Sequence, residues 1–62
     1  MFAKIKRLME LEHINQKELA QKLNMTAVDI SRFFNGKRKP TIEFVVKVSK
    51  LFNISIDWLL NE

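Results

Sequence analysis

Apolar residues recur along this chain at the three- and four-residue spacing of an α-helix. Near the start, Ile5, Leu8 and Met9 lie on one helical face, which predicts a first helix from about Phe2 to Glu12. Polar segments interrupt the periodicity several times and divide the chain into about five short helices. The pattern therefore indicates an all-α fold.

Helix start and stop signals support this division. Four residues are suited to N-capping the later helices: Asn15, Thr26, Thr41 and Ser55. Glu18 follows Asn15 at the spacing of a capping box, and Asp29, three residues after Thr26, lies near the positive end of the helix dipole. Three sites are suited to ending helices because Asn and Gly tolerate left-handed backbone: Asn24, Asn35-Gly36 and Asn53.

The segment from about residue 16 to residue 35 predicts a helix-turn-helix. A connection as short as Asn24–Thr26 forces the two flanking helices to cross steeply and touch, and the small Ala20 suits the point of contact. Five apolar residues are expected to fill the wedge behind it: Leu19, Leu23, Met25, Ile30 and Phe33. In such a unit the second helix projects into the DNA major groove.

Composition limits the alternatives. A chain of 62 residues forms one domain, so we predict a single helix-turn-helix domain over residues 1–62. It contains no cysteine, which excludes a disulfide framework and thiolate metal ligands. There is neither a signal-peptide h-region nor an apolar run long enough for a membrane span. We expect a soluble protein of the cytoplasm.

The excess positive charge is concentrated in one short segment. Residues 30–40 carry Arg32, Lys37, Arg38 and Lys39 and no acidic residue. Outside this segment the seven remaining basic residues equal the seven acidic ones, so the segment accounts for the whole formal net charge of +4. A focused basic patch suits a polyanion, whereas the alternative is a solvated, solubilising loop.

The stretch "NQKELAQKLNMTAVDISRFFNGKRKPT", followed by "LFNISIDWLLNE", resembles the Cro/cI-type helix-turn-helix family of phage repressors and bacterial regulators. The resemblance covers nearly the whole chain. It implies a compact five-helix, lambda-repressor-like domain that binds a palindromic DNA operator as a homodimer and acts as a repressor. It also implies a location in the bacterial nucleoid or the phage-infected cell.

Two departures from the family pattern are informative. The family usually has Gly at the tight turn where this chain has Asn24, but the turn requires only a positive φ. Many relatives also pair an Arg in the first helix with a Glu near the end of the third, at the positions of Met9 and Phe34 here. Replacing a buried ion pair by apolar groups is often neutral, so we expect Phe34 to be structural and to meet Met9.

With Ile30 and Phe33 inward, the outer face of the third helix carries the candidate DNA contacts. The resemblance places base contacts at Ala27, Val28 and Arg32. Arg32 suits guanine O6 and N7, and the two apolar side chains suit thymine methyl groups. Asp29 could accept from a cytosine amino group, or it could serve as a carboxylate at the helix N-terminus.

Contacts to the DNA backbone are expected on both sides of this helix. Asn15 and Gln16 begin the second helix, where free N–H groups favour a phosphate, and the resemblance places Gln16 at the backbone. The other expected backbone contacts are Ser31, Asn35, Lys37, Arg38 and Lys39. Arg38 is also a candidate for the minor groove.

The fourth helix has a broad apolar arc. Its central stripe is predicted to be Ile42, Val45, Val48, Ser49 and Phe52. We expect Phe44 and Leu51 from its flanks, with Trp58 from the last helix, to be buried in a homodimer or against a further C-terminal segment. The alternative is that such a small domain needs all of these residues for its core.

Other functions have less support. One His and no Cys supply neither a catalytic constellation nor metal-ligand spacing, so we expect no enzyme, no metal and no cofactor. No small-molecule ligand is evident, and the basic residues do not lie along a helix as a membrane-surface protein requires. The rival hypothesis is a protein-interaction module on the same fold, such as an antitoxin or the partner of an anti-repressor.

Overall fold

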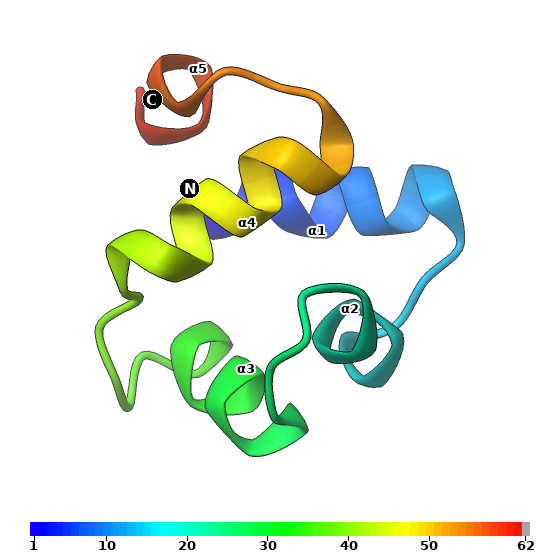
Figure 1. Cartoon of the computed structure of the whole chain (residues 1–62), viewed down its shortest axis with the longest axis vertical. Coiled ribbons are helices and arrows are strands. Elements are labelled where there is room, and N and C mark those ends of the chain that lie inside the picture. Colours follow the sequence, from blue (N-terminus) through cyan, green and yellow to red (C-terminus); the bar gives the residue numbers. More distant parts are fainter. Residues whose placement is uncertain (62) are drawn as a thin grey trace.

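In a computed structural model, which describes residues 1–61, the chain forms five α-helices and no strand within that range. The helices are α1 (Phe2–Glu12), α2 (Gln16–Lys22), α3 (Ala27–Phe34), α4 (Ile42–Phe52) and α5 (Ile56–Leu60). Figure 1 shows α1 and α4 crossing in the middle of the molecule, with α2 and α3 at one end and α5 at the other. The all-α, five-helix prediction is confirmed.

Each helix after the first begins with a side-chain cap. The oxygen atoms of Asn15, Thr26, Thr41 and Ser55 accept hydrogen bonds from backbone N–H groups three residues later, at 2.8, 3.1, 3.1 and 3.0 Å. The Asn15 cap is a full capping box, because Glu18 in turn accepts from the Asn15 N–H at 3.0 Å. These are the four caps that the sequence predicts.

The first four helices all end in a left-handed residue: His13, Asn24, Gly36 and Asn53. At each of these ends, the left-handed residue and the residue after it donate their N–H groups back to the last turn. This is the Schellman arrangement, which satisfies carbonyl groups that the helix leaves without partners. The sequence predicts three of these ends, but the role of His13 was missed.

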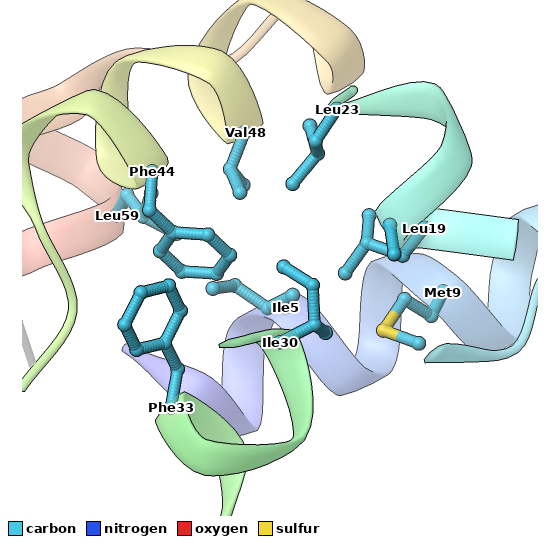
Figure 2. Close-up of a cluster of buried hydrophobic side chains, with 10 residues drawn as sticks. Ile5, Met9, Leu19, Leu23, Ile30, Phe33, Phe44, Val48 and Leu59 are labelled. Carbon is cyan, nitrogen blue, oxygen red and sulfur yellow. The ribbon is translucent and has the colours of Figure 1, made fainter. Parts of the chain in front are cut away.

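The core lies where all five helices meet. Its fully buried side chains include Ile5, Leu19, Ile30, Val48 and Leu59, and thus one from each helix. Figure 2 shows these side chains pointing toward one another, with the two rings of Phe33 and Phe44 side by side. Their centroids are 5.0 Å apart and their planes are tilted by 55°, a favourable aromatic geometry.

Phe34 is structural, as predicted, but its aromatic partner is Phe2. The two ring centroids are 4.9 Å apart, and both side chains pack partly buried against the core. Met9, the partner expected from the sequence, is buried and lies close to Leu19 in Figure 2. Phe33 is buried within the core, and Phe34 packs against the same core. Both of the adjacent phenylalanines are therefore structural.

The predicted apolar stripe of α4 is confirmed for Val48, which is buried, and for Val45 and Phe52, which pack against the core, but it was wrong at the start of the helix. Phe44 was expected on a dimer face but is fully buried, whereas Ile42 was expected in the stripe and is 83% exposed. The large ring of Phe44 fills the space beside Phe33 and sets the rotation of the helix. Ile42 is the first residue of α4 and projects past the core into solvent.

Lys4 is part of the packing between α1 and α5. Its ammonium group lies 4.7 Å from the centre of the Trp58 ring and donates hydrogen bonds to the backbone carbonyls of Trp58 and Asn61. A cation at a helix C-terminus is favourable for the exposed carbonyl groups. Lys4 thus links α1 to the end of α5.

The left-handed turn at Asn24, with φ of 54°, gives a direct stability test. We expect Asn24→Ala to lower the free energy of unfolding by about 1–2 kcal/mol. Alanine has a Cβ, which disfavours positive φ, but it has no polar side-chain group to form the local hydrogen bonds that help Asn adopt this conformation. Asn24→Gly should leave stability equal or slightly higher. Thermal unfolding followed by circular dichroism measures both, and a loss of about 1 kcal/mol lowers Tm by roughly 4–8 °C in a domain of this size.

The matched control is Gln21→Ala, since Gln21 is exposed within the right-handed part of α2. If Asn24→Ala unfolds at the same temperature as the wild type, the turn does not depend on the left-handed residue.

Candidate nucleic-acid interface

The geometry of this surface begins at the contact between α2 and α3. The turn at Asn24 brings the two helices together, and the Met25 N–H donates to the Ala20 carbonyl at 2.9 Å. Ala20 is 3% exposed, as its small side chain at the crossing predicts. Ile30 is fully buried, so the opposite face of α3 is directed away from the core.

That outer face carries the predicted base contacts. Ala27, Val28 and Arg32 are all exposed, with Val28 57% exposed. Arg32 does not enter the core, and residues 27–34 are helical. A single exposed apolar side chain is ordinary on a protein surface. Ala27 and Val28, however, are two neighbouring residues in the first turn of α3, a helix that lies at one end of the molecule (Figure 1).

The cationic loop is held against the end of α3. Gly36, with φ of 72°, donates to the Phe33 carbonyl at 3.2 Å. Lys37 and Arg38 both donate their N–H groups to the Arg32 carbonyl, at 3.0 and 3.3 Å. A Cβ at Gly36 would meet no atom within 4 Å, so the backbone conformation is what favours glycine there.

Arg38 and Asp29 pair with each other. The Arg38 guanidinium donates to the Asp29 carboxylate at 2.9 Å, and its central carbon lies 5.4 Å from the centre of the Phe33 ring. Sequence reasoning assigned these two residues separately to the DNA backbone and to the bases. Their pairing was missed because it depends on how the loop after Gly36 folds back onto the first turn of α3.

Three other predicted backbone contacts also take part in intramolecular bonds. The Asn35 side-chain amide donates to the Ser31 hydroxyl at 3.3 Å, along the last turn of α3. The Asn15 side-chain oxygen is used by the capping box. Gln16 is exposed beside it, in the first turn of α2.

Three cations complete this surface. Arg32, Lys37 and Lys39 are exposed, and none of the three forms a salt bridge to a residue in the range 1–61. They lie on or just after α3, so the outer face of that helix is bordered by positive charge. The arrangement suits a ligand with an apolar and hydrogen-bonding interior and a negatively charged edge.

Residues 1–61 hold no cluster of three or more His, Cys, Asp or Glu side chains that could bind a metal ion. Within the same range, no helix is both long enough and apolar enough to cross a membrane.

Comparison with known proteins agrees with this geometry. A family model described as helix-turn-helix matches residues 5–59. The chain is 38% identical over 47 residues to the HTH-type transcriptional regulator ImmR of Bacillus subtilis (strain 168), which covers 76% of this chain and 37% of that protein. It is 33% identical over 58 residues to the HTH-type transcriptional activator BcrR of Enterococcus faecalis, which covers 94% of this chain and 28% of that protein.

The chain thus spans only about a third of the length of these relatives. No solved structure gives a significant match. The family match covers both helices of the α2–α3 unit and the loop that follows it. The chain belongs to the helix-turn-helix family of DNA-binding transcriptional regulators, of the Cro/C1 type.

Proposed function

We propose that this chain binds a specific double-stranded DNA operator by placing α3 in the major groove. The observation that carries the proposal is the joint placement of an exposed helix face and a cationic border. Ala27, Val28 and Arg32 are exposed on α3, and the loop bearing Lys37 and Lys39 is bonded to the end of the same helix. A helix fits the major groove, where phosphates line both edges.

Sequence reading would depend on few side chains. Arg32 supplies the strongest base contact, a bidentate pair with guanine worth roughly 1–3 kcal/mol of discrimination. Ala27 and Val28 lie one turn earlier and supply apolar contacts to thymine methyl groups. Such contacts carry no hydrogen bond. The preference for one base pair should therefore be strong at the position contacted by Arg32 and weaker at the positions contacted by the start of α3.

Affinity would come mainly from the phosphates. Lys37 and Lys39 lie beyond the end of α3, and Gln16 stands at the start of α2, so the contacts would bracket the groove from two sides. Ser31 and Asn35, which are bonded to each other, and Asn15 would add neutral hydrogen bonds. Contacts of this kind fix orientation on the duplex without specifying its sequence.

We further propose that the chain binds a palindromic operator as a homodimer. Half-sites one turn apart require recognition helices about 34 Å apart. The Cα trace measures 26 × 24 × 18 Å, so two adjoining copies have the size to span such an operator. Trp58 and Leu60 are 46% and 54% exposed, and with the half-buried Leu51 they supply apolar surface for the contact.

Of the two regulatory outcomes, we propose repression. Occupying an operator within a promoter blocks polymerase without any further contact, whereas activation needs a contact with polymerase as well. One relative is named a regulator and the other an activator. Our choice of repression therefore rests on its simpler mechanism, which needs no contact with polymerase.

The division of labour between Arg32 and Lys37 is testable. For an operator selected from a random duplex pool, the Arg32→Ala variant should lose about 1–3 kcal/mol of binding free energy. Its preference at one base pair should also be relaxed. Lys37→Ala should weaken all duplexes alike and reduce the slope of log K against log salt by about 0.9. Fluorescence anisotropy over a salt series measures both quantities.

Exposed Lys17 on α2 offers a control, because Lys17→Ala removes a charge outside the proposed contacts. Equal, sequence-independent losses for Arg32→Ala and Lys37→Ala would contradict the role of Arg32. Binding by the wild type that does not weaken with salt would contradict DNA binding altogether and favour a protein-interaction module.

The homodimer proposal predicts a difference between whole and half operators. Wild-type protein should bind the palindrome far more tightly than one half-site, and Leu60→Glu should reduce this advantage by burying a charge in the contact. Leu60 suits the test because its exposed side chain contributes little to the core. Sedimentation on both duplexes gives the stoichiometry, and equal affinity of wild-type protein for the two duplexes would contradict the dimer.

A further inference from the structure

Arg38 has three attachments to α3. Its backbone N–H donates to the Arg32 carbonyl at 3.3 Å, its guanidinium bonds to Asp29 at 2.9 Å, and the same group lies over the Phe33 ring at 5.4 Å. The side chain therefore runs back along the helix from its C-terminal end toward its first turn. This course differs from that expected of a cation that extends into solvent to reach a phosphate.

The partner of Arg38 stands at a sensitive position. Asp29 is the third residue of α3, in the turn whose side chains approach base edges when such a helix enters the groove. A bare carboxylate there would be repelled by the phosphates on either side, and it would also be drawn to cytosine amino groups. The bond to Arg38 neutralises this charge at the place where it would be most harmful.

We propose that the Asp29–Arg38 pair is a positioning latch and that Arg38 is not a phosphate contact. The latch closes the loop of residues 35–39 onto α3 and cancels the Asp29 charge inside the groove. Binding then relies on Arg32, Lys37 and Lys39. This inference rests on the proposed DNA-binding function, but the existence of the latch itself can be tested without DNA.

Isolated surface ion pairs contribute little, and the two side chains here are 48% and 33% exposed. The latch differs from such a pair because the backbone of Arg38 is already fixed by Gly36 and by the Arg32 carbonyl. Less conformational freedom is then lost when the side chain pairs. The contact with Phe33 restricts the guanidinium further and adds a cation–π attraction.

The test with DNA compares Asp29→Asn, Arg38→Gln and the double variant. Arg38→Gln should weaken binding to every duplex because it leaves the carboxylate unpaired. Adding Asp29→Asn should restore both the wild-type affinity and the wild-type slope of log K against log salt. Asp29→Asn alone frees a cation and should steepen the slope by about 0.9, the value for one phosphate contact.

Lys37→Gln and Lys39→Gln are the matched controls, because each removes one loop cation that has no salt bridge within residues 1–61. Each should flatten the slope by about 0.9 relative to the wild type. If the double variant retains a slope flattened to the same extent as Lys37→Gln, Arg38 is a phosphate contact and the proposal is overturned.

The test without DNA is a double-mutant cycle on unfolding by urea. The pair should couple by roughly two- to five-fold in the unfolding equilibrium constant, at the upper end of surface ion pairs. Strictly additive effects of the two substitutions would refute the latch. If wild-type protein binds no duplex but the coupling is present, the latch stands and the DNA-binding proposal fails.

Discussion

The interface depends on one constraint, the left-handed turn between α2 and α3. Because Asn24 reverses the backbone with φ of 54°, the two helices meet over the small side chain of Ala20. Ile30 is thereby buried, and once one face of α3 is inward, the helical period directs Ala27, Val28 and Arg32 outward. The exposure of the predicted base contacts thus follows from backbone conformation and packing together.

Short helices make the caps unusually important in this chain. The helices have 11, 7, 8, 11 and 5 residues, and isolated helices shorter than about 12–15 residues are marginal in water. Four side-chain caps and four left-handed ends supply partners for terminal backbone groups that a small core cannot shield. The same device acts at the candidate interface, because the end of α3 also fixes the cationic loop.

Features determined by local chemistry or by strong helical periodicity could be predicted from the sequence, whereas the packing choice between neighbouring large side chains could not. Asn15, Thr26, Thr41 and Ser55 each cap the next helix through bonds that span three residues, so a short window contains all the information. His13 was missed because left-handed helix ends are usually Gly and sometimes Asn, so a histidine gives a weaker signal. Ile42 and Phe44 were exchanged because a helical wheel gives the angle between two side chains, but not which of them fits beside Phe33.

The Asp29–Arg38 pair shows that counting charges along a sequence can overestimate the number of unpaired cations at the candidate interface. Four basic residues and no acid lie between residues 30 and 40, but the folded loop brings Asp29 from just outside that segment to within 2.9 Å of Arg38. With Arg38 paired and Arg32 proposed to contact a base, Lys37 and Lys39 are the loop cations that remain for the phosphates of the proposed half-site. Because each phosphate contact contributes separately to counterion release, a surface with so few cations binds weakly by itself. In the proposed homodimer, two copies on a palindrome would double the number of contacts, so weak individual half-sites would favour recognition of the complete operator over scattered single half-sites.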